Sequence, residues 1–199
     1  MTAKPGFFNR IKALDTWQKT LLATALTERM LPNYQLFAQV TDQENSDKAM
    51  IALDLLWQSL TDRKFKLNFE RLINQMETLI PEEQQYDCYA VYPATDLLTA
   101  LVTIFTALQQ KIETDLINIS KLSSSTVAAF IEASESDAAQ ASNNDDWVFD
   151  HPLMQEEREL QEQLLDWVEQ LTPNDIEEVK GLRKELREAG ISNLGISLN

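Results

Sequence analysis

The sequence has 199 residues, of which 44% are apolar, with only four glycines and a formal net charge of −15. This length suits one domain with a sizeable core. The scarcity of glycine argues against all-β folds and against nucleotide-binding α/β folds, which use glycine in turns and phosphate loops. A single cysteine, Cys88, excludes an internal disulfide and fits a reducing compartment. We therefore expect one all-α domain over residues 1–199 and a cytoplasmic location.

The negative charge is concentrated in one part of the chain. Residues 1–66 carry nine Lys/Arg and seven Asp/Glu, a difference of +2, whereas residues 132–178 carry fifteen acidic residues and the single base Arg158, a net of −14. Such a field repels phosphate backbones. We expect no direct binding of nucleic acid.

The N-terminal region predicts three helices. A short amphipathic helix over residues 7–14 is followed by one that Asp15 caps, with Gln18 at the reciprocal capping-box position. Proline removes a backbone donor and clashes with the preceding turn, so this second helix is expected to stop before Pro32. A short helix then restarts over residues 33–40.

The middle of the sequence contains the most apolar helix, Pro93–Gln110. Two core-facing helices precede it, one over residues 50–60 and one between the cap Asn68 and Pro81. The large apolar residues of 93–110 cover well over half of a helical wheel, so neighbouring helices must bury them. We expect this helix at the centre of a bundle of about seven to nine helices. Its regularly spaced threonines make it a poor membrane span, and we expect no membrane contact.

A further helix is expected over residues 113–133. The run of hydroxyl residues at 123–126 competes for backbone hydrogen bonds, and a bend is expected there. The stretch from about 134 to 146 has no large apolar residue and predicts an exposed polar loop.

The C-terminal region predicts two helices and a tail. Pro152 opens the first helix, and Thr172 caps the second with Pro173 at its first position. Gly190 provides a left-handed stop. The tail over residues 191–199 is apolar enough to dock on the body of the protein.

Three separated motifs carry a family resemblance. They are Glu-Arg-Met-Leu-Pro-Asn-Tyr at 28–34, Val-Tyr-Pro-Ala at 91–94, and Lys-Gly-Leu-Arg-Lys-Glu-Leu-Arg-Glu-Ala-Gly at 180–190. With these motifs the sequence resembles the YjaG-like family of small cytoplasmic bacterial proteins, classed as a domain of unknown function, from about Trp17 to Ile196. The resemblance implies an all-helical fold and supplies no activity.

Known catalytic and metal-binding patterns find little support. A di-iron bundle needs Glu-x-x-His pairs, but Val148 stands three residues before the only histidine, His151. One cysteine and one histidine cannot supply a zinc site, and no calcium loop is present, which leaves only a carboxylate-held cation open. Cys88 could act as a nucleophile with His151 as base, but a lone cysteine beside a core helix is more often a small buried side chain. We expect no cofactor and no functional metal, and we favour a non-enzymatic protein without excluding an enzyme.

The polar residues around Pro32 form the first candidate site. The proline frees backbone carbonyls that Arg29 or Asn33 could satisfy, and a hydrogen-bonded helix junction is the favoured interpretation. The alternative is a small polar pocket in which Arg29 binds an anionic ligand.

A polar stripe on the central helix forms the second candidate site. Asp96, Thr99, Thr103, Thr106 and Gln110 recur at steps of three and four. The favoured interpretation is a tight helix contact with threonine hydroxyls bonded to carbonyls one turn back; the alternative is a polar groove with Asp96 at its mouth, near Tyr92. Should the two sites meet, an anion-binding pocket becomes more credible. The candidate ligand-binding residues are Glu28, Arg29, Asn33, Tyr34, Tyr92 and Asp96.

A basic face of the last helix forms the third candidate site. Lys180, Arg183, Lys184 and Arg187 lie late in that helix, where positive charge complements the helix dipole. We favour intramolecular pairing with the acidic region, and the alternative is a docking surface for an acidic partner or an anion.

These observations leave three hypotheses for function. The leading one is a non-enzymatic interaction or adaptor protein that binds a protein partner through helix surfaces and its acidic face. The second is a small-molecule-binding protein or enzyme with a polar pocket around Arg29, Asn33 and Asp96. The third is an acidic mimic of nucleic acid. Homo-oligomerisation stays open.

Overall fold

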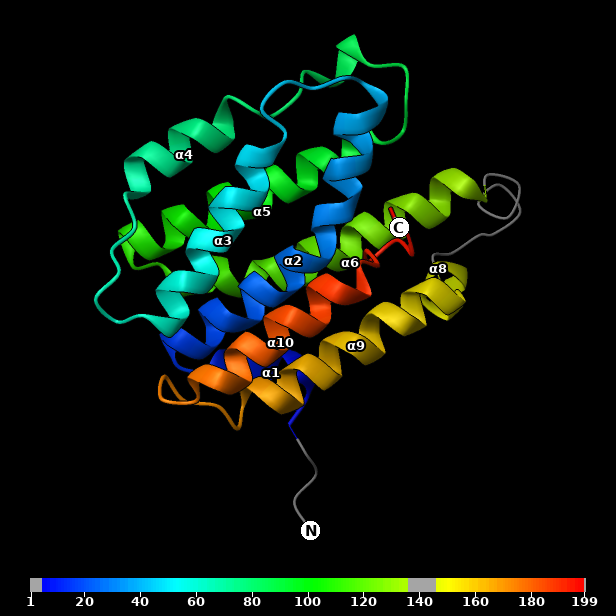
Figure 1. Ribbon diagram of the computed structural model, residues 1–199. Helices are drawn as coiled ribbons and strands as arrows, with labels where there is room; N and C mark the ends of the chain where they lie inside the picture. Colours follow the sequence, from blue (N-terminus) through cyan, green and yellow to red (C-terminus); the bar gives the residue numbers. More distant parts are fainter. Residues whose placement is uncertain (1–4, 136–145, 199) are drawn as a thin grey trace.

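The computed structural model describes residues 5–135 and 146–198. Within these ranges it contains nine α-helices, one 3-10 helix and one isolated bridge, between Ile191 and Ser197. The all-α expectation is confirmed (Figure 1). The helices are α1 (Phe7–Ala13), α2 (Thr16–Val40), α3 (Asp47–Thr61), α4 (Phe69–Glu77), η1 (Glu83–Gln85), α5 (Val91–Gln110), α6 (Glu113–Ser134), α8 (Asp146–Asp150), α9 (Pro152–Val168) and α10 (Ile176–Ala189).

Helix α5 lies in the interior, as its composition predicts. Leu97, Leu101, Ile104 and Phe105 are fully buried, and α5 packs chiefly against α2, α4 and α6. By length and apolar composition alone α5 could cross a membrane, but 56% of that stretch is buried inside the bundle. A core helix meets the same criterion, and its place here is compatible with a soluble protein.

Helix α2 shares the central position with α5. It contacts α3, α5, α6, α9 and α10, and in Figure 1 it runs between α3 and α4 on one side and α6 and α9 on the other. The prediction that this helix stops before Pro32 is wrong, because α2 continues through Pro32 to Val40. Pro32 lacks the N–H that would bond to the carbonyl of Glu28 four residues back, and it is itself buried among neighbours. The next carbonyl, that of Arg29, accepts a hydrogen bond from the backbone N–H of Asn193 at 3.1 Å.

Local capping signals placed three helix ends correctly. Asp15 and Gln18 form the expected capping box, Asn68 caps α4 through the backbone of Arg71, and Gly190 ends α10 with φ of 58°. These contacts join residues close in sequence, so the sequence alone reveals them.

The C-terminal half departs from the prediction at one helix start. Helix α6 is continuous through 123–126, where Thr126 bonds to the carbonyl of Leu122 one turn back and Ser123 donates to α9. The last helix begins at Ile176 rather than at Pro173. The carboxylate of Asp175 accepts hydrogen bonds from the backbone and the hydroxyl of Thr172, which closes residues 172–175 into a turn before the helix. The polar loop expected at 134–146 falls mostly on 136–145, outside the described residues.

The buried apolar residues form a main cluster and a smaller second cluster. The main cluster contains residues from each of the helices α1 through α6 and from α9 and α10. The second cluster lies between the end of α6, α8, the start of α9 and the C-terminal tail, and its buried members are Val127, Ile131, Val148, Met154 and Leu194. The tail therefore docks on the body, as expected.

Candidate functional site

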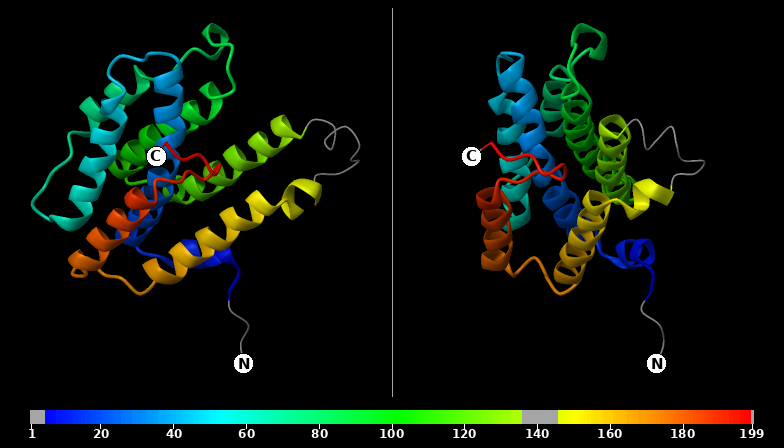
Figure 2. Two further views of the ribbon diagram at one scale, coloured as in Figure 1. Left: turned by 45° about the vertical axis from the view of Figure 1, so that its right-hand side comes forward. Right: turned by 90° about the vertical axis from the view of Figure 1, so that its right-hand side faces the viewer.

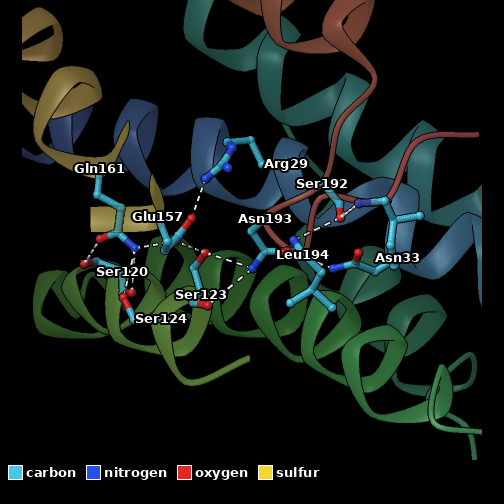
Figure 3. Close-up of polar contacts among 11 residues, drawn as sticks. Arg29, Asn33, Ser120, Ser123, Ser124, Glu157, Gln161, Ser192, Asn193 and Leu194 are labelled. Atoms are coloured by element: carbon cyan, nitrogen blue, oxygen red, sulfur yellow. Dashed lines mark hydrogen bonds and ion pairs between the residues drawn. The ribbon is translucent and has the colours of Figure 1, made fainter. Parts of the chain in front are cut away.

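A buried polar network joins α2, α6, α9 and the C-terminal tail (Figure 3). Its centre is Glu157 of α9, whose side chain is fully buried and lies 2.5 Å from the guanidinium of Arg29. The hydroxyl of Ser123 and the side-chain amide of Gln161 each donate to the same carboxylate at 2.6 Å. A charge that is paired and hydrogen-bonded on several sides tolerates burial. The positive charge of Arg29 is thus already matched within the protein.

The C-terminal tail completes this network. Asn193 is 1% exposed; its side chain donates to Ser123 and accepts from Asn33 at 2.8 Å. The Oδ1 atom of Asn33 is buried and accepts no hydrogen bond within the described part of the chain. Asn33 therefore holds the tail against α2.

A second polar cluster ties α10 to α2 and α3. Glu28 is 4% exposed and accepts from the indole of Trp57 at 2.7 Å and from Arg187 at 2.7 Å. Arg187 also bonds to Asp54. Burial disfavours the charged guanidinium, but its hydrogen bonds to Glu28 and Asp54 outweigh this, and the pKa of Arg187 is raised.

All four cations of the basic face are paired within the chain. Arg183 and Arg187 reach Asp54 of α3, whereas Lys180 and Lys184 pair with neighbours on their own helix, Glu177 and Glu188. The sequence predicted that these cations would pair with the acidic region 132–178, but of their partners only Glu177 belongs to that region.

Tyr34 and Tyr92 differ in their surroundings. Tyr34 is 2% exposed, packs against Phe37, and has a raised pKa because burial disfavours the phenolate. Tyr92 is 48% exposed. Tyr34 thus belongs to the core, and Tyr92 lies at the surface.

Asp96 has its own partners on the other face of α6. Its carboxylate accepts from the hydroxyl of Thr126 at 2.7 Å. Burial raises the pKa of Asp96, and the negative charge of Glu83 adds to the shift. The hydroxyl–carbonyl bonds expected along its stripe are absent at Thr99, Thr103 and Thr106 among the described residues; α2 makes this kind of bond instead, at Thr20, Thr24 and Thr27.

The six candidate ligand-binding residues therefore lie in separate surroundings. Glu28 faces Arg187, Arg29 faces Glu157, and Asn33 faces Asn193. Tyr92 and Asp96 share another face of the bundle. No hydrogen bond or ion pair joins the Arg29 region to Asp96 within the described part of the chain.

A cleft that was not predicted from the sequence lies between α6 and α9. Its volume is about 1010 Å³, at the upper end of the range typical of ligand sites. The only signals of this cleft in the sequence are the adjacent rings of Phe7 and Phe8 and the ring of Phe149. They did not predict a cleft because the residues are distant in sequence and only folding brings them together. We call it the α6–α9 cleft; it is lined by Phe7, Phe8, Ser120, Lys121, Ser124, Ser125, Ala128, Phe149, Met154, Gln155, Arg158, Glu159, Gln161, Glu162 and Gln163.

The α6–α9 cleft combines exposed rings with a polar floor. Phe8 and Phe149 are 42% and 54% exposed. The floor contains Ser120 and Gln161, which bond to each other at 2.6 Å, and Gln161 links the cleft to the carboxylate of Glu157. The buried network therefore fixes the spacing of the two helices that form the cleft walls.

Within residues 5–135 and 146–198, no group of three His, Cys, Asp or Glu side chains could hold a metal ion. Cys88 is a half-buried free thiol, and none of the hydrogen bonds of His151 in those ranges reaches it: the ring contacts Glu135 and caps α9 at Leu153.

The fold and these polar clusters define the class of this protein: an all-helical bundle with an open cleft between two of its helices. Comparison with known proteins identifies the family within that class. Residues 6–197 match the family described as "Protein of unknown function (DUF416)", and the chain belongs to this family.

Relatives span nearly the whole chain. It is 34% identical over 188 residues to "Uncharacterized protein YjaG" of Escherichia coli K12, covering 94% of each, and 32% identical over 196 residues to an uncharacterized protein of Haemophilus influenzae, covering 96% of each. The crystal structure of a DUF416 family protein from Shewanella baltica OS155 is similar with a TM-score of 0.90 and 48% identity, covering 98% of this chain and all of that one. The YjaG-like resemblance is thus confirmed.

Proposed function

We propose that this protein is a non-enzymatic adaptor that receives an amphipathic helix of a partner protein in the α6–α9 cleft. The observation that carries the proposal is the cleft itself, open and about 1010 Å³ in volume, with the rings of Phe8 and Phe149 exposed beside it. Grooves of this kind bind the apolar face of a helix, and aromatic residues commonly anchor such contacts.

The charge around the cleft favours a basic helix. Helices α8 and α9 lie in the region 132–178, whose net charge is −14 from fifteen acids and one base. Exposed Glu159 lines the cleft on α9, and such a field attracts cations over a distance. Two cations, Lys121 and Arg158, also line it, and Lys121 lies 5.6 Å above the ring of Phe8. The partner helix would place its basic residues toward Glu159 and its apolar stripe against the rings.

Affinity purification with matched variants tests the adaptor function. The Phe8→Glu/Phe149→Glu variant should lose a partner that the wild type retains, while Val40→Glu/Ile112→Glu, which alters two exposed apolar residues away from the cleft, should keep it. Recovery of the same proteins with all three chains would refute docking in the cleft.

Charge variants test the sign of the partner. For a synthetic amphipathic helix with lysine flanks, Glu159→Lys should weaken binding and Arg158→Glu should strengthen it, and affinity should fall as salt rises. The opposite order would show that an acidic helix fits better.

A cytoplasmic location is part of the proposal. It is supported by the free thiol of Cys88 and by the burial of α5 inside the bundle. Fractionation of cells that express the tagged chain tests it, and recovery in the membrane pellet would count against it.

Binding of a small molecule near Arg29 and Asn33 is a second candidate function. The buried Oδ1 of Asn33, which lacks a donor among the described residues, favours it. A ligand there would have to supply a donor, since Glu157 already matches Arg29. Asn33→Leu should abolish binding of such a ligand while Asn74→Leu, at an exposed position of α4, should not; equal binding by both variants would exclude this site.

The acidic-mimic hypothesis receives less support. Glu162 and Asp166 of α9, with Glu169 just after it, converge on the guanidinium of Arg10. A mimic needs its negative charges free at the surface, and these three are already engaged.

A further inference from the structure

A group of aromatic rings and carboxylates lies on the face of α6 opposite the α6–α9 cleft. Tyr89 precedes α5, Tyr92 and Asp96 follow one and two turns later on the same side, and Phe130 comes from the end of α6. The ring centroids of Tyr89 and Tyr92 are 5.5 Å apart with the planes tilted by 56°, and those of Tyr89 and Phe130 are 5.8 Å apart at 59°. The three rings are therefore contiguous.

These rings remain accessible. Tyr92 is 48% exposed, and Tyr89 and Phe130 are partly exposed. Asp96 is held between α5 and α6 by the hydroxyl of Thr126 at 2.7 Å. A large aromatic side chain at the surface beside a fixed carboxylate is a common arrangement in sites that bind organic cations.

The carboxylate beside the rings, that of Asp96, is not paired with a cation in the described part of the chain. Burial raises the pKa of Tyr89 to about 12, and the nearby charges of Asp96 and Glu132 add to the shift. Asp96 makes no ion pair within the described part of the chain. The two stretches that carry the site residues, 86–110 and 122–135, contain no lysine or arginine. The site therefore offers a carboxylate beside exposed rings, and the stretches that carry it supply no cation of their own.

The distribution of the carboxylates selects the kind of cation. Among the described residues, no three acidic, histidine or cysteine side chains come close enough to hold a metal ion. A metal ion needs several oxygen ligands at short distance, whereas an alkylammonium group spreads its charge over a larger surface and binds through ring faces and one carboxylate.

We propose that Tyr89, Tyr92, Phe130 and Asp96 form a binding site for an organic ammonium group. The rings contact its methyl or methylene groups, and Asp96 balances its charge. The chemistry is shared by a free quaternary amine and by the side chain of a lysine on another protein. This site is independent of the adaptor function proposed for the cleft.

Titration by NMR of the chain with ¹³C-labelled aromatic residues tests the proposal. Choline chloride and Nα-acetyl-lysine methylamide are the two probes, each compared with sodium chloride at equal ionic strength. At least one probe should shift the ring signals of Tyr89, Tyr92 and Phe130 along a saturable curve, and the better one identifies the source of the ammonium group. Shifts that grow linearly for both probes, or that appear at other rings only, would overturn the site.

Matched variants separate this site from a general effect of charge. Asp96→Asn keeps an acceptor for Thr126, and Tyr92→Ala removes an exposed ring; each should weaken binding of the better probe at least about fivefold, as expected for loss of one ionic or cation–π contact. Asp87→Asn removes the same charge at a nearby exposed position and should leave binding unchanged. Equal weakening by Asp87→Asn and Asp96→Asn would reduce the effect to net charge and refute the site.

Discussion

At the scale of single residues, Glu157 shows how one carboxylate can determine the packing of several helices. Its side chain is fully buried and receives donors from α2, α6 and α9 itself. A buried ion pair adds little net stability compared with apolar residues, but removing one partner leaves a buried charge without compensation. The network should therefore favour one arrangement of α9 over others.

The first prediction concerns this buried pair. Glu157→Ala should lower the free energy of unfolding by about 3–5 kcal/mol, because Arg29 is left unpaired in the interior. Urea denaturation measures the change. Glu159→Ala, an exposed acid on the same helix, should change stability by less than about 0.5 kcal/mol. A double variant, Arg29→Met/Glu157→Leu, should be more stable than Glu157→Ala; a still less stable double variant would contradict an uncompensated charge as the cause.

The second prediction concerns Asp96 and pH. Burial raises its pKa, so the folded state holds the proton more tightly than the unfolded chain does. The contribution of Asp96 to stability is thus present below the pKa of the unfolded chain and is lost as pH rises through the raised pKa of the folded state. Asp96→Asn should therefore be more stable than the wild type at pH 7 and show a flatter dependence of stability on pH in the acidic range. Thermal unfolding from pH 3 to pH 7 measures this, with Asp87→Asn as control; a destabilised Asp96→Asn at pH 7 would speak against desolvation.

What the sequence reveals about single residues depends on how far apart the partners lie. The pair Asp15 and Gln18 lies within one turn, so its capping box was predictable. Arg29 and Glu157 are separated by 128 positions, and nothing local to either residue indicates the other. An anionic ligand for Arg29 was a reasonable hypothesis until its carboxylate partner was known.

At the scale of elements, α1 illustrates how a short helix is fixed by charge. Its seven residues are too few to form a stable helix in isolation, so contacts with the rest of the protein must hold it. Arg10 makes such contacts and is only 5% exposed. The guanidinium bonds to Glu169, Asp166 and Glu162 of α9 and its terminus, and these bonds raise its pKa, the contact with Glu169 most strongly. These contacts with α9 hold α1 in the position where its Phe7 and Phe8 line the α6–α9 cleft.

The third prediction follows from this contact. Arg10→Ala should release α1 and leave three like charges facing one another, with a loss of about 1–3 kcal/mol. Hydrogen exchange should show reduced protection over residues 7–13 and little change in α5. Lys12→Ala, at an exposed position of the same helix, provides the control, and unchanged protection in Arg10→Ala would mean that Phe7 and Ile11 suffice to hold α1.

Helix continuity was harder to predict than helix identity. The apolar period found the core faces of α3, α4 and α9, because burial alternates with the turn of the helix. From local rules alone, Pro32 predicted a break and the hydroxyl run at 123–126 predicted a bend. In both places a tertiary contact lies beside the predicted interruption: the backbone of Asn193 donates to the carbonyl of Arg29, and Glu157 accepts from the hydroxyl of Ser123.

At the scale of the whole molecule, the C-terminal tail connects the buried polar network to the second hydrophobic cluster. It crosses from α10 over α2 toward α6 (Figure 2), with Asn193 in the buried network and Leu194 in the second cluster. The second cluster has five buried apolar members, far fewer than the main cluster around α2 and α5. Because burial of apolar surface is the main source of stability, the two parts should open with different free energies.

The fourth prediction distinguishes these two parts. Leu101→Ala, in the fully buried centre of α5, should cost about 2–5 kcal/mol and lower hydrogen-exchange protection throughout the bundle. Val148→Ala, in the second cluster, should cost about 1–3 kcal/mol and lower protection mainly in α8, the start of α9 and the tail. Both effects follow from which cluster each side chain fills. Loss of protection in α5 caused by Val148→Ala would show instead that the clusters open together, and the tail would then act as a rigid link through which the second cluster stabilises α2 and α5.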